Sequence, residues 1–453
     1  MKRIKIVQLL KSSDSRNNLY IKGWVRTKRD AKNFSFIEIN DGSCLANLQI
    51  IASDTLENYS DIRKLTTGSA IKVSGALTPS QGKGQQWELQ ARQIDIIQIA
   101  SETFPLQKKR HSDEYLRTIA HLRPRTNKYG AAFRIRSELA FAIHKFFHDR
   151  GFHYIHTPIL TGSDCEGAGE MFRVTTLKPG HKDIQNDFFG QEANLTVSGQ
   201  LECEMLALAL GDVYSFGPTF RAENSNTRRH AAEFWMIEPE MAFYDLNECM
   251  DFAEEMIQHL IHHVTSHCSE DLSLFARFVD KNLLATLENI SQCRFERLPY
   301  SEAVKILSTC NQKFAYPVDF GLELQSEHER YLTETHFKKP VIVFNYPKTI
   351  KPFYMRLNDD NTTVAAMDVL VPGIGEIIGG SQREERLDVL KTRMTQQGMS
   401  HEAYWWYLET RIYGSVPHAG FGMGFERLMM LVTGIANIRD VISFPRTPKN
   451  IDF

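Results

Sequence analysis

Polar and apolar residues alternate along the N-terminal part of the chain, as they do in strands that bury one face. The alternation predicts five short strands, and turn signals such as Asp41-Gly42 separate them. The predicted strands are Leu19–Arg26, Ser35–Asn40, Leu45–Ile51, Ala70–Leu77 and Gln86–Ile99. Five short strands in one segment favour a small barrel, and the five-stranded oligonucleotide/oligosaccharide-binding (OB) fold is the simplest choice.

The pattern changes after this segment. Residues 106–127 lose the alternation and gain charge, so we expect a hinge there. From Lys128 to Asp149 apolar residues recur at helical spacing, which predicts a long helix that ends at Gly151. Beyond it, strands alternate with helices, which indicates an α+β fold. The predicted elements are strands at Asp212–Phe220, Phe234–Phe243, Val341–Phe344, Met367–Val371 and Gly420–Gly424, and helices near 200–210, 247–268, 301–309, 383–397 and 425–432.

Charge is unevenly distributed along the 453 residues, although 53 Lys and Arg nearly balance 55 Asp and Glu. Residues 1–128 hold 22 basic and 12 acidic residues, a net charge of +10, and the remainder carries −12. A local positive excess indicates a surface for a polyanion, most often nucleic acid. Trp24, Phe34 and Phe36 lie among Arg26 and Arg29 in the same segment. A solvated basic surface and aromatic residues of the barrel core are the alternatives.

Composition and cysteine spacing exclude several classes of protein. A hydrophobic content of 42% is that of a globular protein and excludes disordered and collagen-like chains. The seven cysteines form no CxxC pair, which argues for reduced thiols and against a cysteine-based zinc site. No apolar run approaches the length of a membrane span, and the N-terminal one breaks at Gln8. These features predict a cytoplasmic protein without a membrane segment.

Residues 220–234 form a charged loop between two apolar stretches and give the first chemical signal. Arg221 stands at one end of this loop and Phe234 at the other. On two neighbouring strands such a pair could hold a nucleotide, with the guanidinium on a phosphate and the ring on the base. A surface hairpin held by salt bridges fits the same residues.

Two glycine-rich segments add acidic and basic groups. Residues 367–383 contain Asp368 and Glu376, which could approach one another across a turn and offer oxygens to Mg²⁺. Residues 420–428 read as a glycine-rich strand that opens a helix with Arg427 at its start, an arrangement that favours an anion. Neither segment matches the dinucleotide-binding or P-loop pattern.

Together and in this order, these segments resemble the motifs of the class II aminoacyl-tRNA synthetases. Thr157-Pro158 resembles part of motif 1, which would span about 135–160. The hairpin that contains Arg221 resembles motif 2 (about 213–243), and Gly424-Phe425-Glu426-Arg427 resembles motif 3 (about 418–432). The N-terminal barrel points to the aspartyl/asparaginyl/lysyl subgroup. Within it, the segments that resemble the asparaginyl-tRNA synthetases are 163–172, 198–201, 220–225, 351–355 and 413–418. The chain departs from the family at Ala231, where Leu is usual, and at Ser443, where Pro is usual.

The resemblance implies a domain order and an activity. It implies an OB-fold anticodon-binding domain over residues 1–105, a hinge over 106–127, and a catalytic domain over 128–453 built on an antiparallel sheet flanked by helices. The implied activity is ATP-dependent activation of L-asparagine and its transfer to tRNA(Asn), with Mg²⁺ bound and two chains in a homodimer. No protein nucleophile is needed, because the ionised substrate carboxylate itself attacks the α-phosphate of ATP.

The resemblance also assigns roles by motif position. Arg221, Arg427 and Glu376 are the implied catalytic residues, and Glu376 with Asp368 is implied to carry Mg²⁺; the two acids are eight positions apart here and seven in the aspartyl enzymes. The implied ATP-binding residues are Arg221, Glu223, Arg229, His230, Phe234, Glu376, Gly424 and Arg427. The implied asparagine-binding residues are Glu166, Ser198, Gln200, Glu204 and Arg383. The implied anticodon-binding residues are Arg26, Arg29, Phe36 and Gln49.

Asparagine and aspartate are nearly isosteric, so the pocket must separate an amide from a carboxylate. A carboxylate beside Arg383 would accept a hydrogen bond from the amide and repel aspartate, and Glu204 is the sequence candidate. The alternatives are an aspartyl or relaxed-specificity synthetase, a catalytically inactive tRNA-binding paralogue, and an asparagine-making relative of the catalytic domain. The retained charged residues argue against the inactive paralogue, and the attached barrel argues against the asparagine-making relative.

Overall fold

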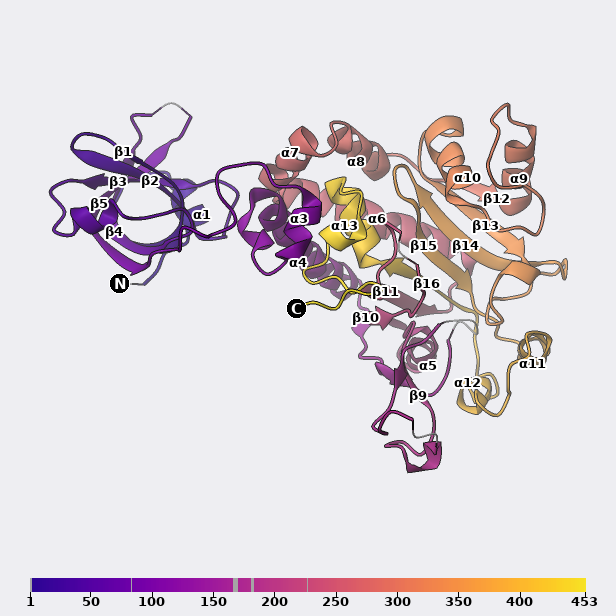
Figure 1. Cartoon of the computed structure of the whole chain (residues 1–453). Helices are drawn as coiled ribbons and strands as arrows, with labels where there is room; N and C mark the ends of the chain where they lie inside the picture. Colours follow the sequence, from indigo (N-terminus) through magenta and orange to yellow (C-terminus); the bar gives the residue numbers. More distant parts are fainter. Residues whose placement is uncertain (1, 83, 166–169, 181–182, 226) are drawn as a thin grey trace. The chain divides into compact units, whose positions relative to one another are not determined.

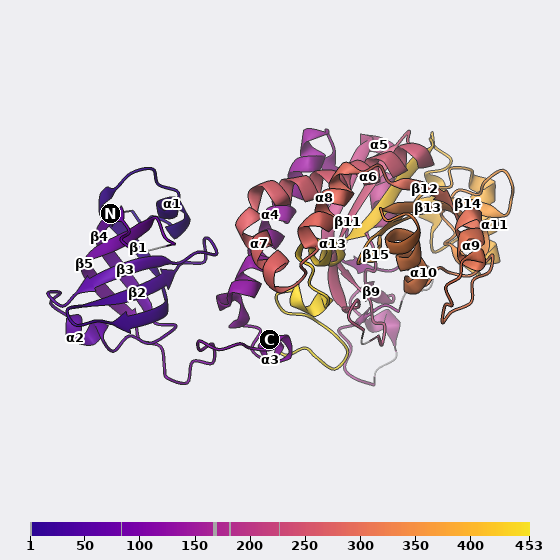
Figure 2. The same cartoon turned by 90° about the horizontal axis from the view of Figure 1, so that it is seen from above.

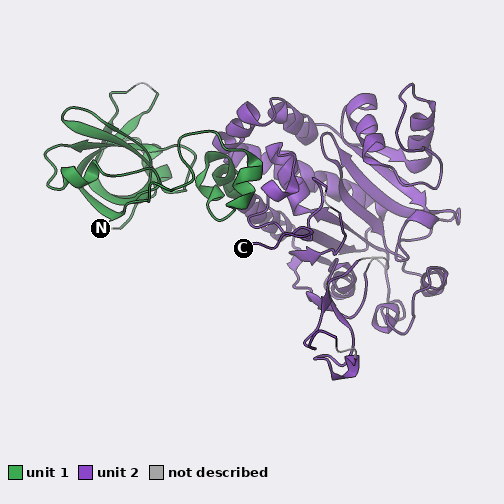
Figure 3. Ribbon diagram, in the orientation of Figure 1, with its two compact units in different colours: residues 1–134 green, residues 135–453 purple. Residues whose placement is uncertain are grey.

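The chain divides into two compact units, Met1–Arg134 and Ile135–Phe453 (Figure 3). The computed structural model describes residues 2–82, 84–165, 170–180, 183–225 and 227–453. Each unit has a hydrophobic core of its own. The segment that the sequence assigns to a hinge belongs to the first unit. Among the described residues, no helix combines the length and the apolar character that crossing a membrane would need.

The first unit contains a closed five-stranded barrel with the strand order β1-β2-β3-β5-β4 (Figures 1 and 2). Its strands are β1 (Arg16–Asp30), β2 (Phe34–Asn40), β3 (Leu48–Ser53), β4 (Ala70–Pro79) and β5 (Trp87–Gln98), with two short helices, α1 (Ile6–Leu10) and α2 (Tyr59–Ile62). All five predicted strands are present, and the barrel is confirmed. Ile37 and Ile39 of β2 are buried in the barrel core, so the intervening side chains lie on its outer face.

The stretch without periodicity contains a short helix, α3 (Asp113–Thr118). The Ser112 hydroxyl caps it by accepting a hydrogen bond from the Tyr115 backbone N–H at 3.2 Å. Leu106 and Leu116 pack with Tyr129 in a small apolar cluster. A helix of 6 residues spans fewer than two turns, so hydrophobic periodicity could not reveal it.

The second unit is built on an eight-stranded sheet with the order β12-β13-β14-β15-β16-β11-β10-β6 (Figure 1). Neighbouring strands are antiparallel except at the two edges, where β6 runs parallel to β10 and β12 to β13. The α+β class and the mostly antiparallel sheet are therefore confirmed. The strands are β6 (His153–Tyr154), β10 (Asp212–Phe220), β11 (Glu233–Ala242), β12 (Glu296–Pro299), β13 (Val341–Pro347), β14 (Thr363–Val371), β15 (Gly375–Gln382) and β16 (His418–Gly424). A separate small sheet contains β7 (Leu160–Thr161), β9 (Ala193–Leu195) and β8 (Arg173–Val174).

Helices pack along this sheet. The helix α6 (Leu246–His267) lies along β14, β15 and β16, whereas α5 (Gln200–Leu210) lies along β10 and β11. A capping box between Asp245 and Glu248 fixes the start of α6. The long predicted helix is present as α4 (Asn127–Asp149). The remaining helices are α7 (Ser269–Phe278), α8 (Leu283–Gln292), α9 (Tyr300–Thr309), α10 (Ser326–Arg330), α11 (Leu387–Gln396), α12 (Trp405–Glu409) and α13 (Phe425–Thr433).

The glycine-rich segment that the sequence places in a turn forms a strand, β15, inside the sheet. A Cβ on Gly380 would lie 2.5 Å from the Cβ of Phe421 and 2.8 Å from the Gly420 carbonyl oxygen. Glycine thus permits the close approach of β16, although it lowers strand propensity and hid this strand from the sequence pattern. The helix expected from residue 383 begins at Leu387, because Arg383 still forms a β-bridge with Met355.

Candidate active site

One pocket of the second unit is lined by the β10–β11 loop, β15 and the start of α13. It brings together all eight residues that the sequence assigns to ATP, from residue 221 to residue 427 along the chain. These residues are Arg221, Glu223, Arg229, His230, Phe234, Glu376, Gly424 and Arg427. The pocket therefore combines three guanidinium groups with an aromatic ring, as a bound nucleoside triphosphate requires.

Arg427 lies in the first turn of α13 and reaches back to β15. Its Nη1 donates to the Glu376 carbonyl oxygen at 2.9 Å and to Glu376 Oε2 at 3.3 Å. The preceding residue, Glu426, is buried. It accepts hydrogen bonds from Arg136 Nη2 at 2.7 Å and from the Trp235 backbone N–H at 2.9 Å. Glu426 thus ties α13 to α4 and β11, which fixes the direction in which Arg427 projects.

Arg221 follows β10 directly, and its backbone pairs with the returning strand. The Arg221 N–H donates to the Ala232 carbonyl oxygen at 3.0 Å, and the guanidinium lies 5.5 Å from the centroid of the Phe234 ring. Arg229 reaches out of the same loop and donates to Ser326 Oγ at 3.0 Å. Burial lowers the pKa of Arg229, and Glu329 opposes this shift. The β10–β11 hairpin thus places the guanidinium groups of Arg221 and Arg229 and the ring of Phe234 around the same pocket.

Two carboxylates from neighbouring strands face each other beside this pocket. A Cβ on Gly379 would lie 3.2 Å from Glu376 Oε1 and 3.6 Å from Asp368 Oδ1, so both oxygens border the space that this glycine leaves open. Val369 pairs with Ile378 but Leu370 pairs with Glu376, so a bulge interrupts β15 between them. The two acids therefore approach one another across the hairpin of β14 and β15, whose turn lies between Val371 and Gly375, in agreement with the predicted approach across a turn.

This acidic cluster also contains residues that the sequence did not indicate. Lys351 Nζ donates to both oxygens of Asp368, at 3.0 and 2.7 Å. Glu329 accepts a hydrogen bond from the Glu376 backbone N–H at 3.2 Å. Burial and the charge of Glu376 raise the pKa of Glu329 to about 7. Burial tends to raise the pKa of Glu376 as well, but Arg427 and Lys351 outweigh it and the pKa is lowered.

The donor set fits a magnesium ion. Mg²⁺ is usually held by one or two carboxylates together with substrate phosphates. Glu376 binds Arg427 through Oε2 and directs Oε1 toward the space above Gly379, where Asp368 Oδ1 also lies. Asp368 would share its charge between the ion and Lys351.

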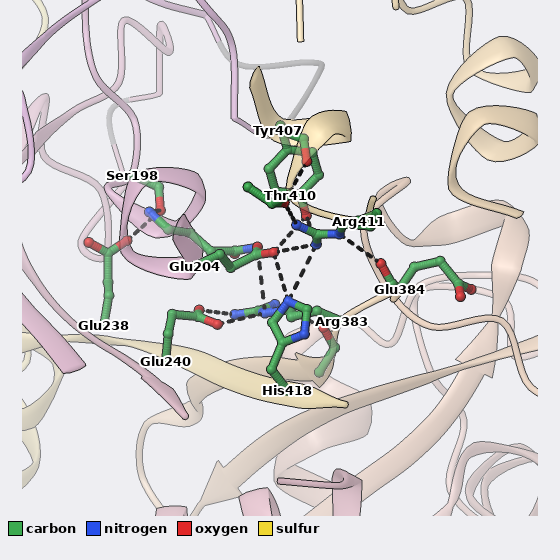
Figure 4. Close-up of polar contacts among 12 residues, drawn as sticks. Ser198, Glu204, Glu238, Glu240, Arg383, Glu384, Tyr407, Thr410, Arg411 and His418 are labelled. Carbon is green, nitrogen blue, oxygen red and sulfur yellow. Dashed lines mark hydrogen bonds and ion pairs between the residues drawn. The ribbon is translucent and has the colours of Figure 1, made fainter. Parts of the chain in front are cut away.

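A second cluster of charged side chains is buried beside this pocket (Figure 4). It contains four of the residues assigned to asparagine, and Glu166 lies outside the described residues. Ser198 donates to Glu238, and Gln200 Nε2 donates to Glu204 Oε1 at 3.0 Å. Arg383 lies 3.9 Å from Glu204, measured from Nε to Oε1. The four described residues are thus brought together as expected.

Arg383 makes its direct contacts with Glu240, a residue that the sequence analysis missed. Its Nε donates to Glu240 Oε2 at 3.1 Å and its Nη2 donates to the other oxygen, so the pair is bidentate. Its Nη1 donates to Ser381 Oγ at 2.8 Å. Burial raises the pKa of Glu240, and the guanidinium of Arg383 opposes the rise. The structure therefore places Glu240, rather than Glu204, in immediate contact with Arg383.

Glu238 and Glu240 could have been found from the sequence. They alternate in the second half of β11, where the other residues are apolar, and alternation places both side chains on one face of the sheet. Both are buried, at 4% and 0% exposure. Two buried acids on one face of a central strand require nearby cations or donors, which is a signal of a polar site.

The predicted anticodon residues lie on the outer face of the barrel. Arg29 pairs with Phe36 across β1 and β2, and its guanidinium lies 4.8 Å from the centroid of the ring. Gln49 of β3 donates to Glu88 Oε2 at 3.3 Å. Arg26 differs, because its guanidinium donates to the Arg125 carbonyl oxygen and to Asn127 Oδ1. The structure thus gathers aromatic, cationic and amide groups on one surface, with Arg26 bound to the next segment of the chain.

Comparison with known families matches both parts of the chain. Residues 112–448 match the family model described as tRNA synthetases class II (D, K and N), and residues 19–97 match the OB-fold nucleic acid binding domain. The chain is 63% identical to the asparagine–tRNA ligase of Nitratidesulfovibrio vulgaris and 61% identical to that of Oleidesulfovibrio alaskensis. Both alignments cover 100% of this chain and 100% of the relative.

Solved structures are similar over nearly the whole chain. The crystal structure of asparaginyl-tRNA synthetase from Pyrococcus horikoshii complexed with asparaginyl-adenylate is 33% identical, with a TM-score of 0.88, over 100% of this chain and 99% of that one. The Entamoeba histolytica asparaginyl-tRNA synthetase in complex with asparaginyl-adenylate is 25% identical, with a TM-score of 0.85, over 99% of each chain.

The Arg383–Glu240 pair makes a prediction about Gly420 of β16. A Cβ on Gly420 would lie 2.2 Å from the Glu240 carboxyl carbon, so Gly420→Ala should push Glu240 away and leave Arg383 buried without its partner. Breaking a buried ion pair costs about 3–5 kcal/mol, so we expect a clearly lower melting temperature. Gly217→Ala on β10 is the control, because its Cβ would meet nothing within 4 Å. Equal melting temperatures for the two variants would contradict the prediction.

Proposed function

The chain belongs to the class II tRNA synthetases of the D, K and N group, and from that membership we propose that it is an asparagine–tRNA ligase. Its substrates are L-asparagine, ATP and tRNA(Asn). The relatives with 61–63% identity over full length support this activity. The structural observation that carries the proposal is the convergence of Arg221, Glu376 and Arg427 on one pocket beside a buried amino-acid site.

Activation requires positioning and charge stabilisation. An oxygen of the asparagine carboxylate bonds to the α-phosphorus, and the bond from that phosphorus to the pyrophosphate oxygen breaks. Arg221 binds the α-phosphate, where negative charge develops, and Arg427 binds the γ-phosphate of a bent ATP. Phe234 stacks on adenine, and Glu223, Arg229 and His230 line the rest of the site. The adenylate then passes its asparaginyl group to the terminal adenosine of the tRNA.

Glu376 and Asp368 would hold Mg²⁺, which supplies positive charge to the triphosphate when bound. The oxygen ligands and the open space above Gly379 support this assignment. Lys351, which binds both oxygens of Asp368, keeps that carboxylate oriented and partly neutralised.

Arg383 and Glu240 read the side-chain amide in this proposal. The amide oxygen accepts from Arg383, and the amide N–H donates to Glu240. Aspartate would bring a second carboxylate against Glu240, and like charges in contact cost several kcal/mol. This favours asparagine over the aspartyl and relaxed-specificity alternatives. Glu204, the sequence candidate, lies 3.9 Å from Arg383 and is bound by Gln200 and Arg411, so we assign the direct contact with the amide to Glu240.

The barrel reads the anticodon. Phe36 stacks on a base, Gln49 offers an amide to a base edge, and Arg29 binds phosphate beside Phe36. Arg26 binds phosphate only if it releases Arg125 and Asn127. The net charge of +10 over residues 1–128 supports binding of an RNA to this part of the chain.

Motif 1 supports a homodimer. Phe141 of α4 and Tyr154 of β6 lie within it and are 61% and 54% exposed. Exposed aromatic side chains of this kind are what a second copy of the chain covers in a two-fold interface. We place the enzyme in the cytoplasm, a reducing compartment that suits seven cysteines with no CxxC pair among them.

The proposed activity is tested by ATP–pyrophosphate exchange with asparagine and aspartate, and by aminoacylation of tRNA transcripts bearing a GUU anticodon. We expect exchange and charging with asparagine and little of either with aspartate, because only the amide can donate to Glu240. A preference for aspartate, or equal use of both, would support the aspartyl or relaxed-specificity alternative. Activity with neither amino acid would support the inactive tRNA-binding paralogue.

Arg221→Ala and Arg427→Ala should each slow asparaginyl-adenylate formation by roughly 10²–10³-fold. Each removes a cation aimed at developing negative charge, which is worth about 2.7–4 kcal/mol at comparable sites. Pyrophosphate exchange at saturating asparagine measures the effect. Arg228→Ala is the matched control, because Arg228 is an exposed arginine of the same loop. An equal loss in that variant would assign the effect to the fold of the loop.

Phe36→Ala should raise the apparent KM for tRNA by roughly 5- to 150-fold, since stacking on a base is worth about 1–3 kcal/mol. Adenylate formation should be unchanged, because the ring contributes to the barrel surface alone. Tyr20→Ala is the control, since Tyr20 of β1 pairs with β4 rather than β2. A parallel fall in adenylate formation would show that Phe36 supports folding instead.

A further inference from the structure

A second ion pair, Arg411 with Glu204, is buried behind Arg383 (Figure 4). Arg411 Nη2 donates to Glu204 Oε2 at 2.7 Å, and neither side chain has exposed surface. Glu204 belongs to α5, whereas Arg411 follows α12, 207 positions further along the chain. Neither Arg411 nor Glu204 takes part in the proposed binding of ATP or in the bond-making step.

Glu204 is held from both sides. Its Oε1 accepts from Gln200, and its Oε2 accepts from Arg411 and from the Tyr407 hydroxyl at 2.7 Å and lies 3.2 Å from His418 Nε2. An ionised carboxylate without water is costly unless opposite charge and donors surround it. Burial would raise the pKa of Glu204, but Arg411, His418 and Arg383 outweigh it and hold the pKa well below its usual range. Glu204 therefore carries a full negative charge beneath the pocket.

Arg411 is itself fixed in place. Its Nε donates to the Glu384 carbonyl oxygen at 3.1 Å and its Nη1 to Thr410 Oγ1 at 3.0 Å. Its guanidinium lies 4.1 Å from the centroid of the Tyr407 ring. Glu204 therefore lies between Arg411 and the residues assigned to the substrate, Gln200 and Arg383. Any influence of Arg411 on the ligand passes through Glu204.

The two buried ion pairs compete for the same cation. Arg383 is bound to Glu240, yet its Nε lies only 3.9 Å from Glu204 Oε1. While Arg411 neutralises Glu204, Arg383 can remain with Glu240. Without Arg411, the attraction between Arg383 and Glu204 would be uncompensated and would draw the guanidinium away from Glu240.

We propose that Arg411 is a positioning residue for amino-acid specificity: by pairing with Glu204, it leaves Arg383 with Glu240 and so sets the pocket for a neutral amide. The inference rests on the proposed function, because it concerns the asparagine site of that enzyme. Tyr407 has a supporting part, since its hydroxyl binds Glu204 and accepts from Arg411 Nη2 at 2.8 Å.

Arg411→Met tests this by removing the charge and keeping much of the volume. In pyrophosphate exchange we expect the KM for asparagine to rise at least tenfold and the preference for asparagine over aspartate to fall at least tenfold, while the KM for ATP stays within twofold. Arg411→Lys keeps the charge but lacks the planar fork, so it should retain part of the preference. If Arg411→Met does not fold, Arg411→Lys and Tyr407→Phe carry the test through the same ratio of preferences.

The double variant Glu204→Gln with Arg411→Met separates charge balance from packing. If the damage in Arg411→Met comes from the unpaired charge of Glu204, removing that charge should restore part of the asparagine KM. Arg393→Met is the structural control, because this buried arginine donates to the carbonyl oxygens of Lys351 and Pro352 and, among the residues that the structure describes, to no carboxylate of the pocket. It should lower the melting temperature and leave the amino-acid preference unchanged.

Two outcomes would overturn the inference alone. One is a wild-type enzyme that prefers asparagine together with an Arg411→Met variant that keeps this preference or, where Arg411→Met does not fold, a Tyr407→Phe variant that keeps it. The other is a double variant no better than Arg411→Met, with the KM for ATP raised as much as that for asparagine. A wild-type chain that activates no asparagine would instead overturn the proposed function, so the two failures are distinct.

Discussion

Compensation of buried charge is the constraint on which the second unit depends. Arg383, Glu240, Arg411 and Glu204 lie where water cannot reach them, and each is stable only because an opposite charge lies within contact distance. These side chains come from β11, α5, the residue that follows β15 and the segment after α12. The sheet and its helices must therefore pack accurately, because a displaced element would leave a buried charged side chain without its partner.

Glycines on the central strands make this arrangement possible. Gly420 of β16 leaves room for the Glu240 carboxylate, and Gly379 of β15 leaves room for Glu376 and Asp368. The same two strands thus border both the buried Arg383–Glu240 pair and the pocket that contains Glu376 and Arg427. Their mutual distance is set by the hydrogen bonds that pair β15 with β16. In-line attack on phosphorus depends on such fixed separation, because positioning supplies much of the rate.

The sequence revealed some parts of this architecture and concealed others for physical reasons. The barrel was predictable because each of its strands has one buried face, which produces alternation. The central strand β15 was not, because Gly375, Gly379 and Gly380 erase that signal. Short helices such as α3 and α12 were also missed, since 6 and 5 residues contain too few turns to show a period.

The candidate site divides in the same way. Arg221, Glu376 and Arg427 came from resemblance to known motifs, and the structure gathers them in one pocket. Glu240 and Arg411 did not. The alternation of Glu238 and Glu240 marks a polar site on β11, but nothing local identifies partners that lie 143 or 207 positions away. Pairing between distant buried charges is a property of the folded chain and leaves its trace in the sequence only as acids or arginines set among apolar neighbours.

The bulge in β15 has a consequence for how this hairpin can change length. A strand that carries one extra residue turns every later side chain to the opposite face unless a kink absorbs it. The bulge between Ile378 and Glu376 absorbs one residue, so the Glu376 side chain lies on the same face of the sheet as that of Asp368. A single residue can thus be inserted or deleted at the bulge without changing how Glu376 and Asp368 face one another. The number of residues between two such acids along a chain is therefore a poor guide to which of them face each other in the folded sheet.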